Sequence, residues 1–200
     1  MEFEKEISKR SSICRNTCEE VITMTIYALG NKIPKIADTA YVHPQACVIG
    51  DVVIGERVFV APMVSIRGDR GSIVIGDETN LQDGVVVHSD PRFTTRIGKR
   101  VNVGHNATIH AESIGDNAAI GMAAVLMLGS KVAEGALIAN SALLHEKTQT
   151  EPYKIYAGIP AKYMRDIDST SSARQAIDVY LDSYIDNTRI YPSDLKELKD

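Results

Sequence analysis

The sequence predicts an all-β solenoid, a parallel β-helix of about six coils that is followed by a C-terminal α-helix. Two observations carry this prediction. Aliphatic residues recur at every sixth position between residues 36 and 144, and glycine often comes next. A six-residue period does not fit an ordinary helix, whereas short strands joined by tight turns suit it well. Glycine at the corners supplies the backbone freedom that such turns require.

The aliphatic ladder is uninterrupted in residue type and is broken only three times in spacing. Extra residues follow Ile66 and Val87, and one residue is missing between Ile109 and Ile114. The ladder positions are Ile36, Val42, Val48, Ile54, Val60, Ile66, Ile75, Leu81, Val87, Ile97, Val103, Ile109, Ile114, Ile120, Leu126, Val132, Ile138 and Leu144. With three hexapeptides per coil, the coils stack at the ~4.8 Å spacing of neighbouring strands. We expect the insertions at corners, where functional residues of solenoids gather.

Composition divides the chain into three segments. Residues 1–23 are charged and lack the repeat, and we expect a poorly ordered N-terminal extension, whose Cys14 and Cys18 we assign no function. Residues 24–150 form the β-helix domain. Residues 151–200 form a C-terminal helical segment, because apolar residues recur at helical spacing from residue 173, and Pro160 suits a first helical turn.

Charge and hydropathy exclude several classes of function. The 200 residues carry 22 basic and 26 acidic side chains and a net charge of -4, which gives no general attraction to nucleic acid or to an anionic membrane. The longest uncharged run has 14 residues, too few for a membrane span. We expect no secretory signal, because the first ten residues carry charges of both signs. Three cysteines do not make a disulfide framework, so we expect a cytoplasmic protein.

Three histidines lie close together in the repeat. His88 follows ladder residue Val87, and His110 follows Ile109, so both hold the same place in neighbouring coils. Their side chains should stack about 5 Å apart, close enough to share a metal ion. The plainer interpretation is that these are surface histidines hydrogen-bonded to neighbours or water.

The third histidine has a different register. His105 follows Val103 by two residues and should project from another face of the prism. A neighbouring subunit in a cyclic trimer could present it to the His88–His110 pair. Three neutral imidazoles and an open position form a zinc site that lowers the pKa of bound water to about 7. The pattern therefore predicts a metal site at a subunit interface.

Three sequence blocks resemble the γ-class carbonic anhydrase family of left-handed β-helix proteins. They are RGDRGSIVIGDETNLQDGVVVH at 67–88, IGKRVNVGHNATIH at 97–110, and the closing AGIPAK at 157–162. The order of the RGD, NLQDG and GHNATIH blocks is specific to that family, whereas many acyltransferases share the hexapeptide repeat. The resemblance spans about residues 24–165 and implies a left-handed coil, a homotrimer and reversible hydration of CO2 to bicarbonate by a zinc-bound hydroxide.

The resemblance also implies roles for individual residues. It makes His88, His105 and His110 the metal ligands, with His105 supplied across the interface. It has Gln82 bind the metal-bound water or bicarbonate, with Asn80 in support. It places Arg67, Asp69 and Asp83 between subunits near the site. A purely structural role in holding the trimer together is as good an interpretation of these three residues as a part in catalysis.

The chain departs from the best-studied branch of that family at two places associated with proton transfer. Arg70 stands where an acidic residue follows the RGD-like motif, and the short segment SDPRFTTR at 89–96 replaces an acidic loop. The chain thus resembles the branch that lacks the acidic loop, in which Asp90 or water alone is left to carry the proton.

The leading hypothesis is therefore a γ-class carbonic anhydrase with Zn2+, although Fe2+ or Co2+ could take the same ligands. One alternative is a metal-binding trimer without catalysis. Another is a metal-dependent acyl-CoA thioesterase, since a hydroxide of this kind can attack a thioester in an open cleft. The third alternative is a hexapeptide acyltransferase. The histidines argue against it, because they form a three-ligand set and leave no lone general base.

Overall fold

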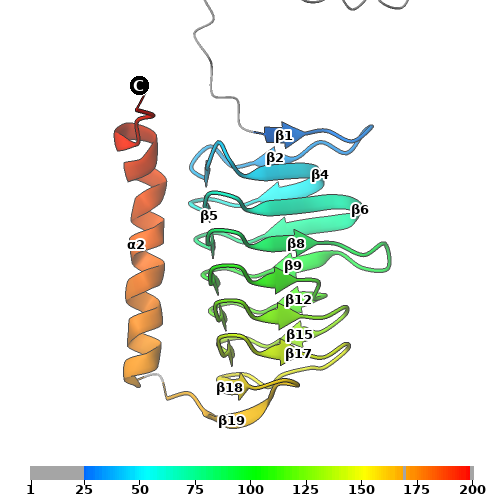
Figure 1. The fold of residues 1–200 in the computed structure, drawn as a ribbon, viewed down its shortest axis with the longest axis vertical. Coiled ribbons are helices and arrows are strands. Elements are labelled where there is room, and N and C mark those ends of the chain that lie inside the picture. Colours follow the sequence, from blue (N-terminus) through cyan, green and yellow to red (C-terminus); the bar gives the residue numbers. More distant parts are fainter. Residues whose placement is uncertain (1–24, 169, 199–200) are drawn as a thin grey trace, which may run out of the picture.

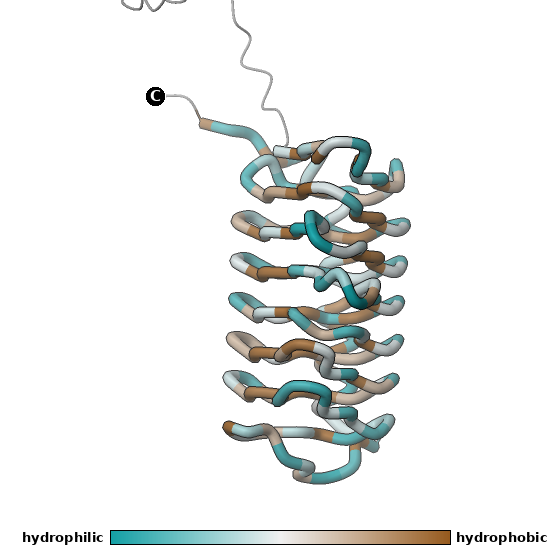
Figure 2. The backbone as a smooth tube through the Cα atoms, turned by 90° about the vertical axis from the view of Figure 1, so that its right-hand side faces the viewer, coloured by the Kyte–Doolittle hydropathy of each residue, from teal (hydrophilic) through white to brown (hydrophobic). Residues whose placement is uncertain are grey.

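The computed structural model describes residues 25–168 and 170–198. These residues form a left-handed parallel β-helix of about seven coils with a C-terminal helix, which confirms the predicted fold class and adds about one coil to the expected number. The coils stack as nearly level rungs of a three-sided prism, which Figures 1 and 2 show from two sides. The N-terminal extension expected at 1–23, with Cys14 and Cys18, lies outside the described residues.

Each side of the prism is a parallel sheet made of one short strand per coil. Face 1 contains β3 (Tyr41–Val42), β5 (Phe59–Val60), β7 (Asn80–Leu81), β10 (Asn102–Val103), β13 (Ala119–Ile120), β16 (Leu137–Ile138) and β18 (Lys154–Ala157). Face 2 contains β1 (Thr25–Tyr27), the first halves of β4 (Cys47–Ile54) and β6 (Ser65–Ile75), β8 (Val86–His88), β11 (Thr108–Ile109), β14 (Val125–Leu126) and β17 (Leu143–Leu144). Face 3 contains β2 (Lys35–Ile36), the second halves of β4 and β6, β9 (Thr95–Ile97), β12 (Ser113–Ile114) and β15 (Lys131–Val132).

The aliphatic ladder forms the core of the prism as predicted. On face 2, Val87 pairs with Ile109 and Ile109 pairs with Leu126, and the other two faces repeat this alignment. Every ladder side chain is buried except Ile36 at the open end, which is half-buried. Ile26 and Tyr156 extend two of the ladders beyond the predicted range, which accounts for the extra coil.

The corners adopt left-handed backbone conformations at fixed places in the repeat. Between faces 1 and 2, Asn106 has φ +58° and Ala123 has φ +56°, and the backbone N–H of each donates to a carbonyl of the preceding coil. Between faces 2 and 3, β4 and β6 continue around the corner without a break. Gly50, with φ +82°, lies at this bend, where a Cβ atom would meet the backbone of Gly68.

The extra residues after Ile66 and Val87 all fall at the corner between faces 2 and 3. The first insertion lengthens β6, and the second forms the loop at 89–94 between β8 and β9 (Figure 1). This is the corner on which His88 and His110 lie, so the expected link between insertions and candidate functional residues holds for these elements.

The segment after residue 150 is only partly helical. β18 still continues the coil, and β19 (Lys162–Asp166) folds back against it in an antiparallel hairpin. Pro160 lies in the turn of this hairpin, so its expected place in a first helical turn is wrong. The helix α2 (Ser172–Asp194) begins only after Ser171, whose side chain accepts a hydrogen bond from the backbone N–H of Arg174 and caps the N-terminus.

Helix α2 runs back along face 1 towards the first coils (Figure 1). Its Leu181 is fully buried, and its Tyr184 and Tyr191 pack against Phe59, with ring centroids 5.5 and 5.1 Å apart. The C-terminal helix therefore docks on the prism of its own chain. No helix in the described part of the chain is long and apolar enough to cross a membrane.

Candidate metal centre

His88 and His110 stack on adjacent coils, as their register predicts. β8 and β11 pair in parallel with Val87 opposite Ile109, so the next residue of each chain segment leaves the same corner. The two imidazole centroids are 5.1 Å apart and the rings are inclined by 32°. Two imidazoles at this separation can both reach one metal ion.

His110 carries a buried nitrogen, Nε2, without a hydrogen-bond partner in the described part of the chain. Burial lowers the pKa of His110 below its ordinary value, and repulsion from His88 lowers it further, although Asp90 opposes the shift. The neutral imidazole that results is the form that binds a metal. An orphaned buried nitrogen costs about 1–3 kcal/mol, which a ligated ion would offset.

His88 shares the carboxylate of Asp69 with Arg67. Its Nε2 lies 3.0 Å from Asp69 Oδ1, while the Arg67 guanidinium donates to Asp69 Oδ2 at 2.6 Å. Burial raises the pKa of Asp69, but the hydrogen bonds from Arg67 and His88 outweigh it, and the net pKa is lowered. A metal ion bound at His88 Nε2 would break the contact of His88 with Asp69. Asp69 would keep its hydrogen bond from Arg67.

The loop at 89–94 presents one more carboxylate beside this pair. Asp90 accepts hydrogen bonds from the Arg92 side chain at 2.6 and 3.1 Å and from its backbone N–H at 3.0 Å. These bonds from Arg92 lower the pKa of Asp90 to about 2. A carboxylate with that pKa holds no proton at neutral pH, so Asp90 is a poor proton carrier. Arg70, where the best-studied branch has an acid, uses its backbone N–H to bind Asp69 at 2.8 Å.

His105 lies at the other edge of face 2, at the corner next to face 1. Its Nδ1 is 2.9 Å from Asp83 Oδ2, and its side chain is 40% exposed. A carboxylate that accepts a hydrogen bond from Nδ1 fixes the tautomer in which the lone pair of Nε2 is available. Metal-bound histidines commonly have such a hydrogen-bond partner on the other ring nitrogen. His105 therefore has the chemistry of a ligand that faces outward from its own chain.

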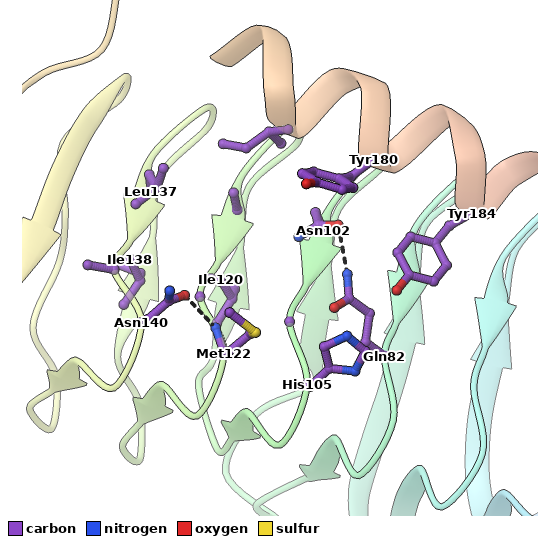
Figure 3. Close-up of a pocket in the computed structure, with 15 residues that line it drawn as sticks. Gln82, Asn102, His105, Ile120, Met122, Leu137, Ile138, Asn140, Tyr180 and Tyr184 are labelled. Carbon is purple, nitrogen blue, oxygen red and sulfur yellow. Dashed lines mark hydrogen bonds between the residues drawn. The ribbon is translucent and has the colours of Figure 1, made fainter. Parts of the chain in front are cut away.

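An amide cluster covers the part of face 1 next to His105. The Nε2 amide of Gln82 donates to Asn80 Oδ1 at 3.2 Å. It also donates to Asn102 Oδ1 at 3.1 Å, which is the bond drawn in Figure 3. Asn80 donates to Asn102 at 3.1 Å in turn. Both bonds of Gln82 use its nitrogen, so the carbonyl oxygen remains available as an acceptor. Asn102 was missed in the sequence, although it precedes its ladder residue just as Asn80 does.

The histidines of one chain do not converge on one point. Within residues 25–168 and 170–198, no three His, Cys, Asp or Glu side chains are grouped so that they could hold a metal ion. His88 and His110 share one corner, and His105 lies across the width of face 2. The donor set fits a three-histidine metal site if a second chain brings its His105 to the pair.

A groove of about 540 Å3 begins beside His105 and runs between face 1 and α2 (Figure 3). Ile177, Tyr180 and Tyr184 of the helix form one wall of it. The sequence analysis gave no site role to the C-terminal helix. The signal that could have revealed the groove is the residue after each ladder position of face 1, which changes from Gln82 to Gly104, Gly121 and Ala139.

Comparison with known proteins identifies relatives by sequence, although no family model matches the chain. The carnitine operon protein CaiE of Proteus sp. (strain LE138) is 38% identical over 144 residues, which are 72% of this chain and 73% of the relative. CaiE of Escherichia coli (strain K12) is 34% identical over 144 residues, 72% of this chain and 74% of the relative.

Two solved structures share both the fold and part of the sequence. A candidate acetyltransferase from Bacillus cereus, the product of the BC4754 gene, superposes with a TM-score of 0.80 at 31% identity, over 84% of this chain and 96% of that one. A hexapeptide transferase family protein from Anaplasma phagocytophilum has a TM-score of 0.78 at 31% identity, over 84% and 98% of the two chains.

Proposed function

This chain belongs to the hexapeptide-repeat family of the carnitine operon protein CaiE. We propose that it is a γ-class carbonic anhydrase. In this proposal three chains form a homotrimer with a metal site at each interface. His88 and His110 of one chain and His105 of the next hold Zn2+, Fe2+ or Co2+. The reaction is the reversible hydration of CO2 to bicarbonate.

The His88–His110 pair is the observation that supports this proposal most directly. The rings lie 5.1 Å apart, and the Nε2 atom of His110 is buried and has no partner among the described residues. A zinc ion held by three imidazoles supplies a water molecule with a pKa near 7, and so a nucleophile for CO2 at neutral pH.

The remaining residues position the ligands and the substrate. Asp83 holds His105 through Nδ1 at 2.9 Å, which keeps Nε2 turned away from its own carboxylate. Asn80 and Asn102 fix the Gln82 amide nitrogen, so that the carbonyl oxygen can accept a hydrogen bond from bicarbonate or water. Arg67 keeps Asp69 ionised beside His88.

Proton release limits the rate in this proposal. Arg92 keeps the pKa of Asp90 near 2, and Arg70 replaces the acidic residue of the best-studied branch. With neither side chain able to carry a proton, solvent water must accept it directly. Turnover should therefore rise with the concentration of external buffer, because buffer substitutes for a missing proton carrier.

The decisive experiment is stopped-flow CO2 hydration on protein of known metal content, purified with zinc and, separately, anaerobically with iron(II). His110→Ala should abolish both metal binding and hydration. His145→Ala is the matched control, because His145 follows ladder residue Leu144 at the same register on face 2 but is exposed. A wild-type protein with full metal occupancy and no hydration above background would refute the proposal.

Acyl transfer is the second candidate, and the 31% identity to two proteins described as transferases favours it. The His105–Asp83 pair beside the groove would then act as a general base for an acyl acceptor. Acyl transfer of this kind needs no metal and no His88. Release of CoA from acetyl-CoA that requires an added acyl acceptor, and that persists in metal-free protein and in His88→Ala, would establish acyl transfer in place of CO2 hydration.

A further inference from the structure

The groove between face 1 and α2 is far larger than CO2 requires. Its volume of about 540 Å3 lies within the ~300–1,000 Å3 typical of pockets for small organic ligands. It begins at Gln82, Asn102 and His105 and extends past the next two coils to Leu137 and Asn140 (Figure 3). From Gln82 in the third coil to Leu137 in the sixth there are three coil spacings, which make its length about 14 Å.

The groove lies where several outward side chains of face 1 are small. In the first two coils, Tyr41 and Phe59 stack at 5.4 Å and fill the space under α2. In the fourth to sixth coils the residue after each ladder position is glycine or alanine, and in the fifth coil the residue before the ladder position is alanine as well, while the helix stays at the same face. These small residues are Gly104, Ala119, Gly121 and Ala139.

The two ends of the groove differ in polarity. The end near the candidate metal centre carries the Gln82 and Asn102 amides and the His105 imidazole. The far end is lined mainly by apolar side chains, including Met122, Leu137 and Ile177. Tyr180 of the helix lies beside Asn102 (Figure 3). A ligand that matches this pattern has one polar head and an apolar tail.

We propose that this groove binds the acyl chain of a carboxylic ester or thioester, with the carbonyl group at the Gln82–His105 end, and that the site hydrolyses it. This inference rests on the proposed metal centre as the source of the nucleophile. Water adds to the carbonyl carbon, and the bond from that carbon to the ester oxygen or sulfur breaks. The leaving group takes a proton, so the products are a carboxylic acid and an alcohol or thiol.

The first test measures binding to metal-free protein by calorimetry, with straight-chain carboxylates from acetate to octanoate as probes. Each methylene that enters the groove should tighten binding by about fourfold. Ala139→Leu fills the groove from face 1 and should weaken octanoate binding by roughly tenfold or more. Ala133→Leu is the matched control: Ala133 follows its ladder residue Val132 as Ala139 follows Ile138, in the same coil but on face 3.

A second variant, which removes side-chain volume from the groove, keeps the inference testable if Ala139→Leu does not fold. Ile177→Ala removes apolar contacts from the helix wall of the groove and adds no side-chain bulk. It should also weaken octanoate binding, while acetate binding changes little. Hydrolysis of p-nitrophenyl acetate, butyrate and octanoate by zinc-loaded protein should follow the same order of chain length. Release of nitrophenol without an added acceptor separates hydrolysis from acyl transfer.

The outcomes separate this inference from the proposed function. CO2 hydration together with binding that does not depend on chain length would overturn the acyl groove and leave the carbonic anhydrase intact. Chain-length-dependent binding without CO2 hydration would support the groove and overturn the carbonic anhydrase. If Ala139→Leu changes the mass of the assembly by light scattering while Ala133→Leu does not, a second chain covers the groove and the inference is wrong.

Discussion

Complementation between two inactive variants tests the proposed interfacial site most sharply. His88→Ala removes a ligand at the corner between faces 2 and 3, and His105→Ala removes one at the corner between faces 1 and 2. Each homotrimer then lacks one ligand at all of its interfaces, so neither should bind metal in stoichiometric amount or hydrate CO2. A mixed trimer contains an interface at which both missing ligands are present.

The expected recovery follows from the positions of the ligands. In any trimer that contains both variants, the His105→Ala chain offers its intact His88–His110 pair to the intact His105 of a His88→Ala chain at one interface. About one site in three is therefore restored. Two different affinity tags on coexpressed chains isolate these mixed trimers, and both metal content and hydration rate should reach about a third of the wild-type values.

Two results would refute this reasoning. A mixed trimer that binds no more metal than its parents would mean that His88 and His105 do not meet across an interface. A monomer near 21.8 kDa in light scattering would exclude the shared site altogether. A mixture of His88→Ala with His110→Ala is the negative control, because both ligands come from one chain and no interface is restored.

Three further predictions concern stability and ionisation. Ile109→Ala removes a fully buried ladder side chain and should lower the free energy of unfolding in urea by about 2–5 kcal/mol. Gly30→Ala should lower the free energy of unfolding by about 1–2 kcal/mol, because alanine disfavours the positive φ at this position. Gly50→Ala should lower it further, because a Cβ at Gly50, unlike one at Gly30, would lie 2.5 Å from a backbone oxygen. Equal shifts in Tm for the two variants would contradict this. By carbon-13 NMR the Asp90 carboxyl should titrate near pH 2 and return towards 3.8 in Arg92→Ala. Because the folded pKa is the lower one, the stabilisation from this pair is complete above about pH 4 and is lost as the pH falls towards 2.

The candidate site divides into features that the sequence could predict and features that it could not. The stacking of His88 on His110 follows from a register of six residues, because parallel pairing of Val87 with Ile109 fixes the next residue of each strand. The bond of Asp69 to His88 and the capture of Asp90 by Arg92 depend on side-chain conformations at an irregular corner. No periodicity encodes those conformations.

The sequence by itself determined the prism, its ladder and the corner that holds the insertions, because a solenoid is built from contacts between coils about twenty residues apart and one inward side chain per strand is enough to set the register. It also misjudged the segment after residue 150, where Pro160 turns a hairpin instead of starting a helix. Only the tertiary structure decided where α2 docks and therefore that the small residues of face 1 leave a groove beside His105. The physical reason is distance along the chain: the groove joins residues 82–140 to residues 177–184, and neither segment alone shows where the other one docks.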